Sequence, residues 1–176
     1  MSEEAVSLRP IAEADLPAFN ELVNDPEAAG EFQWYGWGDP DRFRRRWAEN
    51  GLMSDEQWVF AVTAGGEFLG FVAATRKGPR PTSRYWSIGV QLLPRARGRG
   101  IGTQAQRLLV DYLFAYTPVM RLEADTEAGN LAEQRVLEKL GFTREGVHRA
   151  VNFRDGAWRD MVFYSLLRTD ARPEHP

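Results

Sequence analysis

The sequence predicts a mixed α/β (α+β) domain in which a mostly antiparallel central sheet is flanked by helices. Hairpin signals, which are pairs of apolar runs around a glycine turn, predict antiparallel neighbours at 57–75 and 142–166. Strand-like and helical patterns alternate through the second half, and such alternation implies that some neighbouring strands run parallel through helical crossovers. We therefore expect one mixed sheet in a single domain over residues 1–176, with tails at about 1–4 and 170–176.

Proline, glycine and aspartate divide the first half of the chain into short elements. Apolar and polar residues alternate over Val6–Arg9, which predicts a strand. Asp15 stands where a helix over 16–24 needs an N-cap, and Asp25-Pro26 ends that helix. The next elements are expected in this order: a loop over 32–38, a helix with Asp39 as N-cap and Pro40 in its first turn, and strands over Gln57–Thr63, Phe68–Thr75 and Tyr85–Leu93.

Residues Ile101–Tyr116 show a clear helical pattern. Apolar side chains recur there at steps of three and four, which places them on one stripe of a helix. The elements expected after it are a strand over Met120–Ala124, a helix over Asn130–Leu140 closed by Gly141, and a hairpin of Phe142–Phe153 and Trp158–Leu166 around Asp155-Gly156.

The composition excludes several kinds of chemistry. The 176 residues include no cysteine and two histidines, which excludes disulfides, a thiol nucleophile and a Cys/His zinc site. A Ser-His-Asp triad would need His148, because His175 is the second-last residue. We expect no metal site. The net charge of −3 argues against a nucleic-acid partner, since such proteins concentrate basic residues on one surface.

Hydropathy and charge describe an ordinary globular chain. Hydrophobic residues make up 43% and charged residues 27%, close to the averages of folded domains. The N-terminus carries acidic residues where a signal peptide has a basic start and an apolar run. No apolar run is long enough to span a membrane. We therefore expect one core, no membrane partner and a cytoplasmic location.

Three glycines at alternate positions, Gly98, Gly100 and Gly102, lie between a predicted strand and the long predicted helix. Their backbone amides can turn toward one point, where the helix N-terminus adds partial positive charge. Arg97 and Arg99 would add charged donors. Together they predict a cradle for a pyrophosphate, and the alternative is a glycine-rich connection that binds nothing.

The spacing of these glycines discriminates between phosphate-binding motifs. A Walker A loop needs Gly-x-x-x-x-Gly-Lys before Ser or Thr, and a Rossmann loop needs Gly-x-Gly-x-x-Gly after an early strand; the chain has neither. Arg97, Gly100 and Gly102 fit Arg-x-x-Gly-x-Gly, which resembles the coenzyme A signature of the GNAT acetyltransferases. The run 130–142 resembles the second landmark of that superfamily, an asparagine that opens a helix ending in Glu-Lys-x-Gly-Phe. The final hairpin resembles the branch that contains the ribosomal-protein N-terminal acetyltransferases.

This resemblance implies a GNAT-like sheet with a splayed strand pair at the coenzyme A site, and acetyl-CoA as cosubstrate. The pantetheine arm would pair with the splayed strand like an added strand, and loop amides would hold the pyrophosphate. Asn130 would contact the arm from the opposite side, although an asparagine at this position can also serve as a helix cap alone. The cofactor-binding residues implied are Gln91, Leu92, Leu93, Arg97, Gly98, Arg99, Gly100, Ile101, Gly102, Thr103, Asn130 and Arg135.

The reaction implied is direct attack of a primary amine on the acetyl thioester, without an acyl-enzyme. A backbone N–H of Leu92 or Leu93 would polarise the thioester carbonyl. Many members have a tyrosine as general acid in place of Leu137, and the ribosomal branch often has serine in place of Glu133. The candidate catalytic residues are Glu133 and Ser87. Glu133 is a poor acid unless burial raises its pKa, and on a helix surface it would only be solvated.

Aromatic residues of the first half are candidates for substrate contacts. They lie beside glycines that would let a loop move, and they are Phe32, Trp34, Tyr35 and Trp37. Asp160, on the last predicted strand, could orient an amine or pair with a nearby arginine. The aromatic rings could instead fill the core or a dimer surface.

The expected function is acetyl transfer from acetyl-CoA to a small-molecule or peptide amine, such as an antibiotic, a metabolite or a protein N-terminus. A non-catalytic acyl-CoA-binding module is the alternative, because Ser87, Glu133 and Leu137 depart from the family pattern. A nucleic-acid binder is the least supported interpretation. A homodimer stays open as an assembly.

Overall fold

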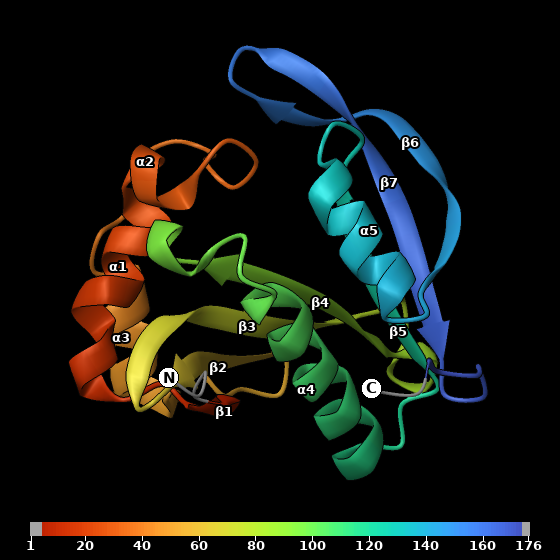
Figure 1. Cartoon of the computed structure of the whole chain (residues 1–176), viewed down its shortest axis with the longest axis horizontal. Helices are drawn as coiled ribbons and strands as arrows, with labels where there is room; N and C mark the ends of the chain where they lie inside the picture. The colour runs from red at the N-terminus through yellow and green to blue at the C-terminus, as the bar shows by residue number, and fades with distance from the viewer. Residues whose placement is uncertain (1–4, 174–176) are drawn as a thin grey trace.

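The computed structural model describes residues 5–173, which form a seven-stranded sheet with helices on both faces (Figure 1). The strands are β1 (Val6–Pro10), β2 (Gln57–Ala64), β3 (Glu67–Lys77), β4 (Tyr85–Leu92), β5 (Arg121–Glu127), β6 (Thr143–Arg154) and β7 (Ala157–Leu167). The α-helices are α1 (Leu16–Asn24), α2 (Pro26–Ala29), α3 (Arg42–Asn50), α4 (Ile101–Tyr116) and α5 (Leu131–Lys139).

The sheet order is β1-β2-β3-β4-β5-β7-β6. Strands β4 and β5 pair in parallel, with α4 as the crossover between them. The other five neighbouring pairs in the described chain are antiparallel. The expected mixed and mostly antiparallel sheet is therefore confirmed, including its two hairpins.

Side chains of the central strands alternate between two cores, one on each face of the sheet. In β2, Phe60 and Val62 belong to the core that also contains Leu109 and Leu113 of α4. The intervening residues of β2 belong to the second core, which contains Phe19 of α1. Because strand side chains alternate with a period of two, a strand buried on both faces has a continuous apolar run, as β2 has over residues 58–62. Helices α4 and α5 thus cover one face, and α1 and α3 cover the other.

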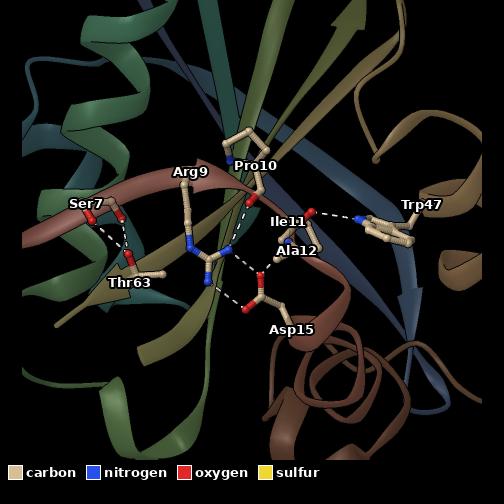
Figure 2. A network of polar contacts seen from close by, with 8 residues as sticks. All are labelled: Ser7, Arg9, Pro10, Ile11, Ala12, Asp15, Trp47 and Thr63. Carbon is tan, nitrogen blue, oxygen red and sulfur yellow. Dashed lines mark hydrogen bonds and ion pairs between the residues drawn. The ribbon is translucent and has the colours of Figure 1, made fainter. Parts of the chain in front are cut away.

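A polar network fixes the first helices to the edge of the sheet (Figure 2). Arg9 of β1 donates two hydrogen bonds to the carboxylate of Asp15, at 2.6 and 2.9 Å. The same carboxylate accepts the backbone N–H of Ala12 at 2.8 Å, and Trp47 of α3 donates to the carbonyl of Ile11 at 2.8 Å. Asp15 does precede α1, but its side chain forms no cap of that helix, because the guanidinium of Arg9 is the stronger partner.

Two further elements differ from the sequence prediction. Helix α3 begins at Arg42 rather than beside Pro40, because Asp39 accepts the N–H of Asp41 and pairs with Arg45 instead of capping the helix. The stop at Asp25 is followed by the short helix α2, whose first amides donate to the Asp25 side chain. A four-residue helix has no detectable hydrophobic period, so sequence patterns do not reveal it.

The expected tails have two different outcomes. Residues 1–4 and 174–176 lie outside the described residues. Residues 170–173 contact the body of the domain, since Arg172 forms an ion pair with Asp111 of α4 and Pro173 packs beside Gly141. Within residues 5–173, no helix has the length and apolar character needed to cross a membrane.

Candidate functional site

Strands β4 and β5 separate in the middle of the sheet. They pair at Trp86 with Leu122 and at Ser87 with Glu123, and at no further position within the described chain. Both strands nevertheless continue in the same direction, to Leu92 and Glu127. The predicted splayed pair is therefore present, and it leaves one edge of each strand without a strand partner beyond this point.

The register shows which backbone groups of β4 face the splay. The N–H of Leu93 donates to the carbonyl of Leu69 in β3 at 2.9 Å, so this donor is already used on the β3 side. Because backbone groups alternate between the two sides of an antiparallel strand, Gln91 also faces β3, while Val90 and Leu92 face the splay. Of the expected backbone contacts, Leu92 is thus available and Leu93 is not. The side-chain amide of Gln91 donates to the carbonyl of Leu22 at 2.8 Å, which ties it to α1.

The loop after β4 leads into the start of α4, where the sequence predicts the cradle. Gly98 and Gly100 adopt left-handed φ angles of 72° and 75°, which other residues adopt only with strain. Gly100 is the N-cap of α4, and no described side chain caps that helix. The first amides of a helix have no partner within it, so those of Ile101 to Thr103 are available to an anion. A Cβ built on Gly98 or Gly100 would meet no atom within 4 Å, so open space lies above this loop.

The cradle lies directly beside the splay. A Cβ on Gly102 would stand 3.5 Å from the side chain of Leu92, the last residue of β4. A ligand that places its phosphates on the cradle can therefore extend an arm between β4 and β5. Thr103 is half-buried and Arg99 is exposed.

Arg97 occupies a position different from the one expected for a phosphate ligand. Its guanidinium donates to the carbonyl of Leu92 at 2.9 Å and to those of Ala28 and Ala29 in α2. Its backbone N–H donates to the carbonyl of Pro94 at 3.2 Å. Neither group of Arg97 is therefore directed to the cradle, because main-chain carbonyls at the end of α2 bind the side chain instead.

Helix α5 borders the other side of the splay. Asn130 is its N-cap: the side chain accepts the N–H of Glu133 at 3.3 Å and donates to Thr126 at 3.0 Å. The capping alternative thus accounts for Asn130 as it stands. Arg135 is exposed on the same helix.

Glu133 lies in the first turn of α5 and is half-buried. Desolvation raises the pKa of its carboxyl, and the nearby amide of Gln106 opposes this rise. Gln106 is fully buried on α4, and its side-chain nitrogen and oxygen lack a hydrogen-bond partner in the described chain. Leu137, one turn further along α5, is fully buried in the core. Glu133 is therefore a half-buried carboxyl in the first turn of α5 whose pKa is raised above the ordinary glutamate value.

A pocket of about 270 Å³ opens at the splay on the face of the sheet opposite to α4 and α5. Its walls come from β3, β4 and β5, and the loop after α2 contributes Phe32 and Tyr35. Gly89 in β4 exposes bare backbone there, since a Cβ at this position would meet no atom within 4 Å. Ser87 lies at the apex of the splay, outside the pocket lining, opposite Glu123 of β5.

Asp125 is the acidic side chain of this pocket that the sequence analysis missed. It lies on β5, and its solvent-accessible carboxyl forms no hydrogen bond or ion pair within residues 5–173. Desolvation by the surrounding walls raises its pKa, and the charge of Glu123 adds to the rise, while Lys77 and His148 oppose it. A signal was present in the sequence: charged residues alternate over 121–127, which marks one face of a central strand as polar.

The other substrate candidates are distributed around this pocket. Tyr35 lines it, whereas Trp34 and Trp37 stack edge-to-face on each other at 5.1 Å, and Trp37 is 81% exposed. Asp160 lines a neighbouring cavity of about 500 Å³ and accepts the N–H of Ala150 at 2.8 Å. The alternative of a core role is therefore excluded for Trp37.

Comparisons with known proteins agree with this geometry. A family model described as the acetyltransferase (GNAT) domain matches residues 6–143. The probable N-acetyltransferase YjcK of Bacillus subtilis is 35% identical over 120 residues, which cover 68% of this chain and 66% of that protein. The putative ribosomal N-acetyltransferase YdaF of the same organism is 33% identical over 88 residues, which cover 50% of this chain and 48% of that protein. The chain thus spans between about half and two thirds of these curated relatives.

The fold is shared with solved acetyltransferases. A spermidine N-acetyltransferase from Vibrio cholerae, in complex with CoA and spermine, superposes with a TM-score of 0.80 at 17% identity, over 94% of this chain and 96% of that chain. At this identity the likeness concerns the fold alone. The matched family model, which spans most of the chain, the splayed strands and the glycine cradle together establish that the protein belongs to the GNAT acetyltransferase family.

Proposed function

We propose that this chain is an acetyl-CoA-dependent N-acetyltransferase that moves the acetyl group to a primary amine by direct attack within a ternary complex. The observation that carries the proposal is the position of the splay. On one side it adjoins the uncapped N-terminus of α4, and on the other it opens into a pocket lined by the solvent-accessible carboxyl of Asp125, whose pKa is raised. A thioester held in the splay would therefore meet an amine that enters from the pocket.

The cosubstrate would be bound mainly by the backbone. The pyrophosphate would accept hydrogen bonds from the amides of Gly98 to Thr103, and the pantetheine arm would pair with the free edge of β4. The N–H of Leu92 would then donate to the thioester carbonyl and stabilise the oxyanion as it develops. Arg97 is left out of this contact set because its side chain binds α2.

Two carboxyl groups would handle the protons. Asp125 would accept a proton from the attacking amine as the new C–N bond forms. The C–S bond then breaks, and the thiolate of coenzyme A takes a proton, for which Glu133 is the donor that the chain offers at α5. Burial raises the pKa of Glu133, which is the condition for a glutamate to serve as an acid. A thiol with a pKa of about 8.5 is a good leaving group, so this help is secondary.

The acceptor is proposed at the level of chemical class. The relatives include proteins named for aminoglycosides and a structure named for spermidine, so both compounds belong in a first panel with peptides that carry a free N-terminus. Since acetyl-CoA is made and kept inside cells, we propose that the enzyme acts in the cytoplasm. All acceptors in the panel present the primary amine that the mechanism requires.

The test has two parts. Isothermal titration should show acetyl-CoA binding with a Kd between about 1 µM and 1 mM, the usual range for enzyme substrates; an absence of binding at millimolar ligand would overturn the proposal. Release of free thiol should then accelerate with at least one amine of the panel. Tight binding without turnover on a broad panel would favour the alternative, a non-catalytic acyl-CoA-binding module.

A further inference from the structure

Residues 30–38 form a segment, here named the strap, that leaves α2 and lies along the pocket beside the splay. Phe32, Gln33 and Tyr35 of the strap line this pocket together with β4 and β5. Gly30 turns the chain out of α2 with a left-handed φ of 82°. The strap therefore forms the one pocket wall that comes from a loop, whereas the sheet supplies the rest.

The distal part of the strap is held by the hairpin of β6 and β7. Asn152 donates to the hydroxyl of Tyr35 at 3.2 Å. The guanidinium of Arg154 lies 5.7 Å from the centre of the Phe32 ring, within the range of a cation–π contact. The same Phe32 ring would be 3.7 Å from a Cβ on Gly129. These contacts place the strap across the pocket from β4 to the hairpin.

The proximal end is held by Arg97 from the coenzyme loop. Its guanidinium donates to the carbonyls of Ala28 and Ala29, the last two residues of α2, and to the carbonyl of Leu92. Carbonyls at the end of a helix have no partner within it, so a cation that binds them acts as a cap. A Cβ on Gly30 would lie 2.7 Å from the Arg97 side chain, so the two segments are in direct contact.

We propose that Arg97 is a positioning residue that couples the coenzyme loop to the strap, and thereby sets the acceptor pocket when acetyl-CoA binds. This inference rests on the proposed function only for the identity of the ligand. The carbonyl of Leu92 ends the strand edge that would bind the pantetheine arm, while Ala28 and Ala29 are the last residues of α2, directly before the strap. One side chain thus joins the two substrate sites.

The geometry requires an arginine. A guanidinium presents several N–H donors in a rigid fork and can bind carbonyls of two segments at once, which the point charge of a lysine cannot do. Desolvation lowers the pKa of Arg97, and no described carboxylate forms an ion pair with it. Arg97 therefore serves as a hydrogen-bonding bridge between main-chain segments rather than as a member of an ion pair.

Hydrogen–deuterium exchange tests the proposal without a known acceptor. The variants are R97A and R97K, and the control is R95A. Arg95 lies in the same turn but pairs with Glu67 and the carbonyl of Phe68, away from the strap. Without ligand, strap amides should exchange at least tenfold faster in R97A and in R97K than in the wild type and R95A. Equal strap exchange in all four proteins would overturn the anchoring role, and recovery in R97K would show that charge alone is sufficient and overturn the bridge.

Addition of acetyl-CoA tests the coupling. In the wild type, protection should extend from the loop at 97–103 to the strap, and in both Arg97 variants it should stop at the loop. Acetyl-CoA affinity should change by less than about threefold in R97K. The opposite result would be a tenfold loss of acetyl-CoA affinity in R97A that R97K restores, together with a steeper salt dependence of binding in the wild type and R97K than in R97A. It would identify Arg97 as a phosphate ligand and overturn the proposal.

The two proposals can fail separately. If no protein binds acetyl-CoA, the proposed function fails, while the ligand-free exchange still decides the anchoring role of Arg97. Matched thermal melting curves of the four proteins show that differences in strap exchange are local. A strap that exchanges faster only because the whole domain is unfolding would show the same acceleration in α4, and this result would contradict the local bridge.

Discussion

Arg154 and Glu127 form a buried ion pair beside the turn of the β6–β7 hairpin. Two hydrogen bonds, of 2.5 and 2.9 Å, join the guanidinium to the carboxylate, and the side chains are only 8% and 6% exposed. Removal of one partner would leave an unpaired buried charge, which costs about 3–5 kcal/mol. R154M should therefore lower the free energy of unfolding by about this amount in urea denaturation.

The double variant E127L/R154M distinguishes the pair from simple packing. Replacement of both charges by apolar residues removes the unpaired charge, so it should recover most of the stability that R154M loses. If the losses of the two single variants add in the double variant, the ion pair is not the source of the effect. Because Arg154 also contacts Phe32, R154M should loosen the strap as well.

Gly100 provides a test of the cradle. An alanine at φ 75° stores backbone strain of about 1–3 kcal/mol, and its methyl group would project into the open space above the loop. G51A is the matched control, because Gly51 has φ 65°, equally open space and a position at the end of α3. Both variants should melt at similar temperatures, and titration should show a loss of acetyl-CoA binding of at least tenfold in G100A alone. Equal acetyl-CoA affinities of G100A and G51A would show that the loop amides do not bind the ligand.

Ionisation of Asp125 should produce the acid limb of the pH profile of kcat/KM. The base must be ionised, so kcat/KM should fall as the pH is lowered through the pKa of Asp125, which desolvation holds above the usual aspartate value. D125N should lose that limb and reduce kcat/KM by about 10²–10⁴. In the control E123Q, which lies outside the pocket lining, the rate should be retained and the limb should move to lower pH, because Glu123 raises the pKa of Asp125. A D125N enzyme with the wild-type profile would exclude Asp125 as the base.

Protonation of Glu145 should account for part of the stability that the fold loses in acid. Hydrogen bonds from Arg121, and then from Ser165, hold the pKa of Glu145 at about 2, below its value of 4.5 in an unfolded chain. A lowered folded-state pKa contributes stability that is complete above pH 4.5 and is lost as the pH falls toward 2. E145Q should therefore be less stable than the wild type at pH 7 in urea denaturation, and the two proteins should converge near pH 2. A constant difference across this range would show that Glu145 acts through packing rather than charge.

Local patterns in the sequence were sufficient for most of the fold. The bounds of α4 agree with the predicted helix, because its apolar stripe is long and begins directly after the glycine loop. The turn at Asp155-Gly156 also lies where the dipeptide places it. The start of α3 moved because Asp39 pairs with Arg45. Helix α1 keeps its predicted bounds, but Asp15 binds Arg9 instead of capping it.

The sequence by itself determined the order of the elements, the glycine cradle and the resemblance to the family, because these depend on neighbouring residues and fixed spacings. Only the tertiary structure decided which groups face the site. Leu92 rather than Leu93 faces the splay, Arg97 binds the end of α2, and the walls of a pocket desolvate Asp125. Strand register, hydrogen-bond partners and desolvation arise between segments far apart in the chain, so no local pattern contains them.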